Sequence, residues 1–289
     1  MKQVQALFLS MIIIMGGYSH SILASSLFHS IKKFYHHIRS TQSKTILQVV
    51  TPPSSINFQD IVGLENAKQI LTHITALTPM ARDTQDVLLK KLIVLTGDSR
   101  TGKTFLSIAF VNELKKCNAN FLCLMPRTII DKNNINQLEN DLEHLNKAVL
   151  IFDESCFYEE SHLKKPIFTE IIRIFTKHIE KNPSKELFCV MHLFSGEVKP
   201  ILNEIDPEIY QHIPLTSPTE SERTEYIRKW ISSYKYPNLW NKIEITDLVN
   251  LTGGLTYSLI DGLLQKCAIT AQTQNQQISY EMILNIHKK

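Results

Sequence analysis

Residues 92–104 read LIVLTGDSRTGKT, an uninterrupted apolar run that leads directly into a glycine-bounded loop with a lysine and a threonine after it. The loop satisfies the pattern G-x-x-x-x-G-K-[ST] through Gly97, Gly102, Lys103 and Thr104. A buried strand before the loop and a helix after it are the setting that this phosphate-binding motif requires. The stretch therefore predicts a strand, a P-loop and a helix, and with them an α/β fold.

The residue types of the loop indicate its chemistry. Its glycines let backbone N–H groups close around phosphate oxygens, and the following helix turns its positive end to the same anion. Lys103 is expected to reach the β and γ phosphates, and the Thr104 hydroxyl to coordinate Mg²⁺. For Arg100, a phosphate contact and a solvent-facing position are equal alternatives. The other nucleotide contacts expected here are Gly97, Asp98, Ser99, Thr101, Gly102 and Phe105.

A second element with candidate chemistry is the run AVLIFDE at residues 148–154. A buried strand there delivers Asp153 at its carboxyl end, where ligands bind in open α/β sheets, so Asp153 is expected to hold the Mg²⁺ shell. Glu154 is then placed to act as general base on a water beside the γ phosphate. A strand that merely ends in two acids is the alternative, but the preceding P-loop favours the catalytic role.

Apolar runs of strand length alternate with helical patterns through the middle of the chain, and only helical patterns follow residue 214. This order predicts a P-loop NTPase parallel sheet with helices on both faces, followed by a small all-α lid domain. The expected strands are 92–96, 121–125, 148–153 and 187–194. The expected helices are 64–77, 103–116, 135–146, 167–179, 219–233, 245–251, 256–273 and 280–287.

Composition narrows the classes of partner. The chain has 289 residues, of which 43% are hydrophobic, enough to bury a full core. A net charge of +3 is too small to indicate nucleic-acid binding, which requires clustered lysine and arginine. The five cysteines have no CxxC spacing and sit in apolar runs, so they are expected to be reduced core residues rather than zinc ligands or disulfides.

The N-terminal residues 6–24 are apolar and long enough to cross a bilayer. One interpretation is a signal peptide cut after Ala24, followed by export. The other is an uncleaved single-pass anchor, which is favoured because the basic residues after the segment outnumber Lys2 before it, leaving the rest of the chain in the cytoplasm. These later basic residues are Lys32, Lys33, Arg39 and Lys44.

The expected domain organisation has four parts. Residues 1–24 form the transmembrane anchor or signal peptide, and residues 25–55 form a juxtamembrane linker whose cations either meet lipid head groups or are simply solvated. The prolines near residue 52 mark the end of this linker, so the folded module is expected to begin near Ile56. The nucleotide-binding domain spans 56–216 and the helical lid domain 217–289.

Two further stretches resemble the AAA ATPase family, most closely the ATPase module of membrane-anchored AAA proteases. Residues 58–68, FQDIVGLENAK, are similar to the family's F-x-D-[IV]-x-G-x-x-x-[AV]-K signature. Residues 251–260, LTGGLTYSLI, are similar to the start of its third lid helix. The resemblance implies ATP bound between the core and the lid, with the backbone at Val62 and Gly63 against adenine and Ser195 at the sensor position.

The chain also departs from that family. No H-E-x-x-H occurs, so the zinc protease chemistry of the resembled branch is not expected. The substrate-gripping pore loop should fall near 130–134, which lacks both its aromatic residue and its glycine. The arginine fingers should fall near 202–206, where Asn203 and Glu204 stand instead. Ser195 can donate a hydrogen bond to water or phosphate, or can be a plain turn serine.

The function expected from these features is ATP binding and slow Mg²⁺-dependent hydrolysis by a membrane-associated AAA-type ATPase that remodels a protein partner. A homo-oligomeric ring or a hetero-oligomer would fit this activity. The alternative is an adaptor that binds ATP as a switch without significant turnover, and a threading unfoldase ranks below both. His192, in an apolar strand, is expected to be a satisfied core histidine rather than a ligand.

Overall fold

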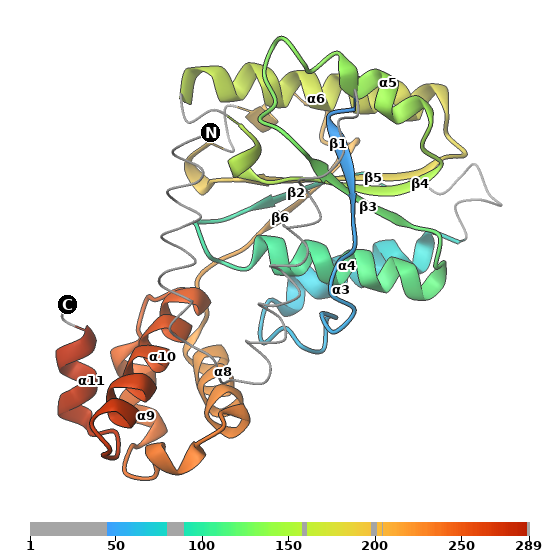
Figure 1. Cartoon of the computed structure of the whole chain (residues 1–289). Helices are drawn as coiled ribbons and strands as arrows, with labels where there is room; N and C mark the ends of the chain where they lie inside the picture. The colour runs from blue at the N-terminus through green and yellow to red at the C-terminus, as the bar shows by residue number, and fades with distance from the viewer. Residues whose placement is uncertain (1–44, 80–89, 158–160, 198–200, 204, 288–289) are drawn as a thin grey trace. The chain divides into compact units, whose positions relative to one another are not determined.

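The computed structural model describes residues 45–79, 90–157, 161–197, 201–203 and 205–287 (Figure 1). Within these ranges, the side chains at 154, 161–165 and 197 are not described. Internal contacts divide the chain into two compact units, with a break between Thr216 and Ser217.

The first unit is built on a six-stranded sheet with the order β1-β3-β4-β5-β2-β6. Neighbouring strands are parallel, except that β1 pairs with β3 in the antiparallel sense. The predicted P-loop type of α/β fold is therefore confirmed. The strands are β1 (Leu47–Val50), β2 (Leu92–Thr96), β3 (Leu122–Pro126), β4 (Lys147–Phe152), β5 (Glu186–Leu193) and β6 (Tyr210–Pro214).

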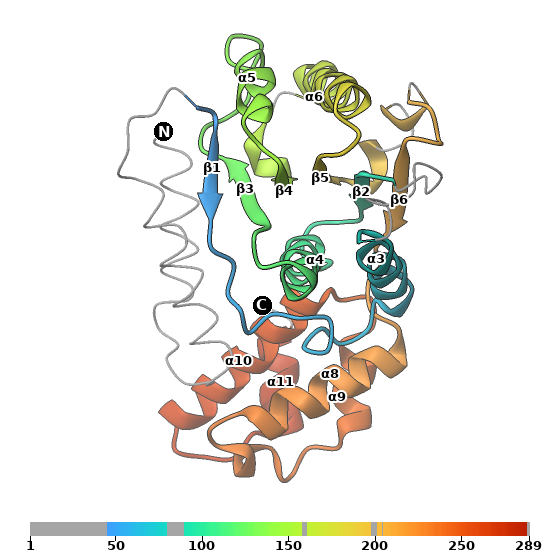
Figure 2. The ribbon, with the colours of Figure 1, turned by 90° about the vertical axis from the view of Figure 1, so that its right-hand side faces the viewer.

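Helices cover both faces of this sheet, as Figures 1 and 2 show. On one face lie α3 (Glu65–Leu77) and α4 (Lys103–Cys117), and on the other lie α5 (Gln137–Glu143) and α6 (Ser161–Lys181). Every residue of β2 and β5 is buried, which explains why these strands are mostly apolar in sequence, with Glu186 and His192 as the charged and polar exceptions in β5.

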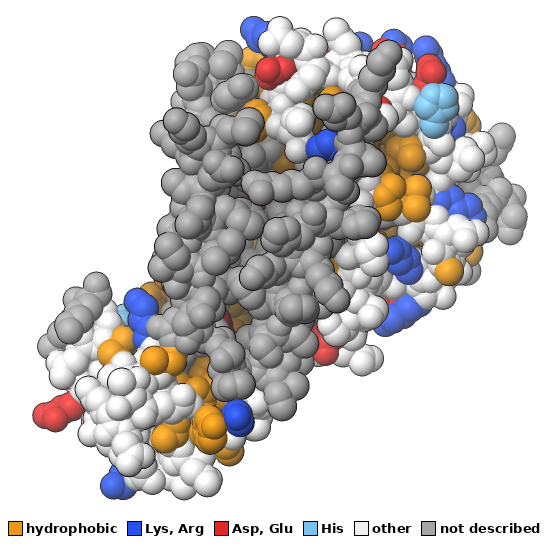
Figure 3. All heavy atoms as spheres, in the orientation of Figure 1, with side chains coloured by type: hydrophobic (Ala, Val, Ile, Leu, Met, Phe, Trp, Pro, Cys, Tyr) orange, Lys and Arg blue, Asp and Glu red, His pale blue; other side chains and the backbone are white. Residues whose placement is uncertain are grey.

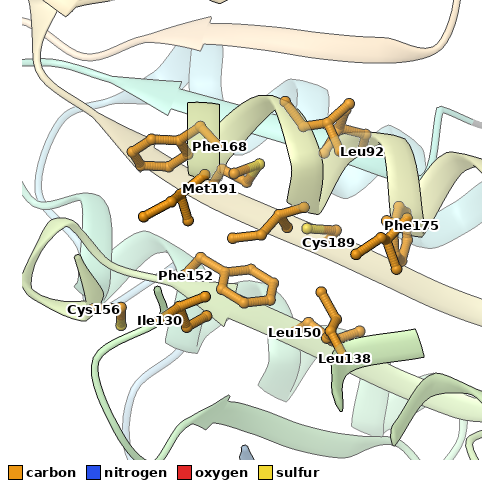
Figure 4. Close-up of a cluster of buried hydrophobic side chains, with 14 of the residues drawn as sticks. Leu92, Ile130, Leu138, Leu150, Phe152, Cys156, Phe168, Phe175, Cys189 and Met191 are labelled. Atoms are coloured by element: carbon orange, nitrogen blue, oxygen red, sulfur yellow. The ribbon is translucent and has the colours of Figure 1, made fainter. Parts of the chain in front are cut away.

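The core on the α5 and α6 side is a cluster of aliphatic, aromatic and sulfur-containing side chains (Figure 4). Phe152 of β4 and Met191 of β5 project into it from the sheet, and Phe168 and Phe175 reach it from α6. Four of the five cysteines are buried, and all five are unpaired thiols. Burial raises the pKa of the Cys156 thiol to about 12, as expected for a core residue.

Two strands differ from the sequence expectation. Strand β6 pairs with β2 at the edge of the sheet. Its sequence YQHIP does not show the apolar pattern of a strand, because only Ile213 is buried. Strand β1 lies inside the segment expected to be linker, so the sheet begins before Ile56. Helix α5 is shorter than the expected 135–146, because the chain is still in a turn at residues 135 and 136 and leaves the helix after Glu143.

Strand β1 is held by a buried carboxylate. Oδ2 of Asp141, in α5, accepts hydrogen bonds from the backbone N–H groups of Ile46 at 3.0 Å and Leu47 at 3.1 Å. Burial raises the pKa of Asp141 above its usual range, against the opposing effect of these two N–H groups. The contact spans almost a hundred positions of sequence, so no local pattern around β1 could reveal it.

The second unit is helical and consists of α8 (Glu220–Ser233), α9 (Ile245–Leu251), α10 (Tyr257–Thr273) and α11 (Tyr280–His287). Thr219 and Glu222 form a capping box at the start of α8. In its core, the Trp230 ring stacks on Tyr234, and its Nε1 donates to the Asp261 carboxylate at 2.7 Å. The predicted C-terminal helices are confirmed.

The apolar N-terminal segment, residues 6–24, lies outside the described residues, as do all four basic residues named after it, Lys32, Lys33, Arg39 and Lys44. Among the helices that the structure does describe, none combines the length and the apolar character needed to span a bilayer. On the face drawn in Figure 3, the described lysine and arginine side chains are scattered rather than gathered in one patch.

We expect Asp141→Ala to lower the free energy of unfolding by about 2–4 kcal/mol, because two buried N–H groups lose their acceptor. Asp141→Asn keeps one acceptor oxygen and should lower it by less. Urea unfolding of the full chain measures both changes. Equal losses in the two variants would show that a neutral acceptor oxygen at this position does not stabilise strand β1, contrary to the expectation for Asp141→Asn.

Candidate functional site

The loop between β2 and α4 begins at a position that only glycine fits. A Cβ atom on Gly97 would lie 2.5 Å from the Leu215 carbonyl oxygen and 2.8 Å from Thr101 Oγ1. The backbone itself causes this approach, because Leu215 N–H donates to Thr96 O at 2.6 Å. The segment that follows β6 therefore fixes where the loop leaves the sheet.

Two residues in the left-handed region turn the loop back toward the helix, Arg100 with φ 69° and Gly102 with φ 101°. A non-glycine residue in this conformation costs roughly 1–2 kcal/mol. The Arg100 side chain is exposed, as is that of Ser99. The arginine therefore holds a strained position on the open side of the loop.

The Lys103 ammonium lies inside this loop. Its Nζ donates to the carbonyl oxygens of Gly97 at 2.7 Å and Asp98 at 2.9 Å, and the residue is only 7% exposed. The Asp98 carbonyl also accepts from Thr101 Oγ1 at 2.9 Å, and the Phe194 ring lies under the ammonium. A positive charge is thus held where the motif predicts phosphate.

The next residue, Thr104, reaches the tip of another strand. Its Oγ1 donates to Asp153 Oδ2 at 3.1 Å, although β5 lies between β2 and β4. Because the hydroxyl hydrogen points to Asp153, the oxygen lone pairs of Thr104 remain available to a cation. Two adjacent hard oxygens suit Mg²⁺, which takes one or two protein ligands and fills its shell with phosphate and water oxygens. These residues fit the expected metal.

Asp153 is kept ionised by its neighbours. Burial disfavours its charged form, but hydrogen bonds from His192 and the Ser155 backbone N–H outweigh this effect and hold its pKa well below the usual range. The bonds are 3.0 Å from His192 Nδ1 to Oδ2 and 3.1 Å from Ser155 N to Oδ1. An ionised carboxylate is the form that binds a cation.

Glu154 begins the short 3₁₀ helix Glu154–Cys156 directly after Asp153. Its side chain lies outside what the structure describes, so its role as general base stays a prediction. The backbone places it at the same edge of the sheet as Lys103, because both follow the carboxyl ends of parallel strands.

Solved structures share this architecture. A chain of the HORMA:CdnC:Trip13 complex of E. coli MS115-1 matches with a TM-score of 0.56 at 18% sequence identity. The match covers 80% of the present chain and 90% of the other. The two chains share a fold. No protein-family model and no curated protein matches the sequence, so the subfamily expected from the sequence motifs stays a prediction.

The segment predicted to contact adenine lies beside the end of the loop. Val62 is buried, and Gly63 and Leu64 both have left-handed backbones. A Cβ atom on Gly102 would lie 3.4 Å from Leu64 Cδ1, so this side chain rests against the start of α4. Phe105, in the first turn of α4, is 41% exposed.

The sensor position also meets the loop. Ser195 Oγ donates to Asp98 Oδ1 at 3.2 Å, which connects the end of β5 to the second residue of the P-loop. Sequence reasoning left open whether Ser195 is a plain turn serine, and this bond joins it to the site. Asn203, at the position expected for an arginine finger, is exposed, and Glu204 lies outside the described residues.

His192 is the residue of the site that sequence reasoning missed. It is fully buried, as expected, but it is hydrogen-bonded to Asp153 and to Ser107 of α4. The available signal was a single histidine in the apolar run LFCVMHLF, three positions before Ser195. That signal alone cannot distinguish a core histidine from one that supports a ligand.

The segment expected to hold the pore loop forms a compact polar turn. Asp131 Oδ1 accepts from the backbone N–H groups of Asn133 at 2.9 Å and Asn134 at 3.1 Å, and Asn134 Oδ1 accepts from Asp131 N–H at 2.9 Å. Just before it, Ile130 forms a parallel bridge with Phe157. The turn is therefore attached to the segment that follows Asp153.

Gly97→Ala should reduce both stability and nucleotide binding, because the new methyl group meets backbone oxygen. Overpacking of this kind costs about 1–3 kcal/mol. Thermal unfolding and calorimetric titration with Mg-ATP measure the two effects. Gly196→Ala is the matched control, since a Cβ there meets nothing within 4 Å. A Gly97→Ala protein indistinguishable from this control would contradict the described loop geometry.

Proposed function

We propose that this chain binds Mg-ATP at residues 97–104 and hydrolyses it slowly to remodel a protein partner, as an AAA-type ATPase. The observation that carries the proposal is the meeting of Lys103, Thr104 and Asp153 at one edge of the sheet. A held ammonium, a hydroxyl and an ionised carboxylate are the groups that a triphosphate with its magnesium requires.

Each residue has a distinct part in the proposed reaction. Lys103 binds the β and γ phosphates, and Thr104 and Asp153 hold Mg²⁺, which neutralises phosphate charge when bound. Glu154 takes a proton from a water molecule while the oxygen of that water forms a bond to the γ phosphorus. The bond between the γ phosphorus and the β–γ bridging oxygen breaks at the same time. ADP and inorganic phosphate are the products.

Slow turnover is proposed because the segment at 202–206, LNEID, contains no arginine. In related phosphoryl transfer, an arginine finger contributes about 10³–10⁵ in rate. Arg100 lies within the phosphate-binding loop itself, and its exposed side chain is open to a ligand or to solvent.

A second candidate is an ATP-gated adaptor that binds nucleotide without significant turnover. The polar turn at 131–134 favours it, because its hydrogen bonds fix a loop that a threading machine would need for gripping substrate. Glu154, directly after Asp153, favours hydrolysis, because a protein that only binds ATP does not need a general base.

A protein partner is proposed on one further ground. A chain of the same fold occurs in a complex with a HORMA protein and CdnC. Oligomers of this chain, either rings of identical subunits or mixed assemblies, would serve the same role.

We also propose that residues 6–24 anchor the protein in a membrane with the ATPase module in the cytoplasm. This proposal rests on the sequence alone.

Lys103→Ala should weaken ATP binding by about tenfold or more, because a charge-assisted hydrogen bond contributes roughly 1.5–3 kcal/mol. Calorimetric titration of the full chain with Mg-ATP measures the change. Lys116→Ala is the control at the other end of α4, where the lysine pairs with Glu113. Wild-type protein that is folded and binds no Mg-ATP would refute the proposed function.

Glu154→Gln separates the two candidate functions. If the chain is an ATPase, phosphate release should fall by about 10²–10⁴-fold with ATP binding retained, since this is the usual contribution of a general base. If it is an adaptor, the variant and the wild type should release phosphate equally slowly. Glu170→Gln, at a half-buried glutamate of α6 that pairs with Arg173, controls for the loss of one negative charge.

A further inference from the structure

His192 occupies a position where an apolar residue would be expected. It lies in β5 between β4 and β2, with its side chain 0% exposed. Val190 and Phe188 share its side of the strand, because side chains alternate along β structure, and Phe188 packs edge to face on Phe110 of α4. Burying a polar group there without hydrogen bonds would cost roughly 2–7 kcal/mol.

Both ring nitrogens of His192 have partners in the nucleotide site. Nδ1 lies 3.0 Å from Asp153 Oδ2, and Nε2 lies 2.8 Å from Ser107 Oγ. Ser107 is one helical turn after Lys103, whose carbonyl oxygen its hydroxyl also approaches at 2.9 Å. The ring therefore connects the tip of β4 to the first turns of α4.

The hydrogen positions follow from the partners. Ionised Asp153 can only accept, so Nδ1 carries a hydrogen. Ser107 either donates to Nε2, or donates to the Lys103 carbonyl and accepts from Nε2–H. The first arrangement leaves Lys103 O with its ordinary helical partner. In both arrangements, Nδ1–H of His192 donates to Asp153.

We propose that His192 is a positioning residue that holds the Asp153 carboxylate beside Thr104, and thereby sets how strongly Mg²⁺ increases the affinity for nucleotide. The inference rests on the proposed function and extends it to a residue outside the motifs. Partners that orient a metal ligand from behind commonly change metal affinity by about 10–100-fold.

The His192 bond differs from the other hydrogen bonds to the Asp153 carboxylate. The Thr104 hydroxyl is exposed to solvent, and the Ser155 N–H lies two residues away on the same turn, so it moves with Asp153. His192 is the donor that is anchored in a different strand and shielded from water. Among the described hydrogen bonds, only the direct bond from Thr104 would then connect the Asp153 carboxylate to α4.

Three substitutions separate positioning from packing. His192→Asn keeps a nitrogen at the same number of bonds from Cα as Nδ1, so it can still donate to Asp153. His192→Gln places its nitrogen at the distance of Nε2, on the Ser107 side. His192→Leu fills the space with no donor. His178→Gln, at a buried histidine of α6 whose Nε2 lies 3.2 Å from Lys185 Nζ, is the matched control.

The measurement is the gain in ATP affinity on going from EDTA to saturating Mg²⁺, determined by titration of each folded full-length variant. We expect this gain to fall by about 10–100-fold in His192→Gln and His192→Leu, and to stay near the wild-type value in His192→Asn and His178→Gln. Equal gains in His192→Asn and His192→Leu, whether both high or both low, would overturn the inference.

A second measurement needs no folded His192 variant. In nucleotide-free wild-type protein labelled with ¹⁵N-histidine, the His192 ring should show a slowly exchanging hydrogen on Nδ1, and Asp153→Asn should shift it. An unprotonated Nδ1 would contradict the positioning role even if ATP binds. Wild-type protein that shows this hydrogen but binds no ATP would instead refute the proposed function and leave the bond intact.

Discussion

The site depends on a contact across an intervening strand. β2 and β4 deliver Thr104 and Asp153 to the same edge of the sheet, but β5 separates them, and the 3.1 Å hydrogen bond between the two side chains closes the gap. Parallel alignment makes this possible, since it brings all carboxyl ends to one side. The separating strand also contributes to the site, because His192 within it contacts Asp153, and Ser195 just after it contacts Asp98 of the P-loop.

Much of the fold could be predicted because the relevant signals are local. The run at 92–104 contains its own strand, turn and helix start, and β2 and α4 begin where the motif requires. Buried parallel strands read as apolar runs, which reveals β4 and β5. The edge strands lack that signal: β6 buries only Ile213, and β1 is held by Asp141 from a distant part of the chain.

The candidate site likewise contains residues that local sequence signals reveal and residues that they do not. The P-loop residues and Asp153 could be proposed from motif chemistry, and the structure places the lysine and the two oxygen donors together. His192 could not be assigned, because its role depends on which strands flank β5 and on where α4 lies. The turn at 131–134 was visible in part: its composition excludes an aromatic gripping loop, but the reciprocal bonds of Asp131 and Asn134 appear only in three dimensions.

The close approach at Gly97 has a mechanical consequence. Leu215 touches the first loop residue and hydrogen-bonds to Thr96, and the helical unit begins only two residues further along the chain, at Ser217. The covalent tether between the two units is thus clamped to the start of the phosphate loop. Tension applied to the helical unit would be delivered to that loop through the main chain, whatever orientation the unit adopts.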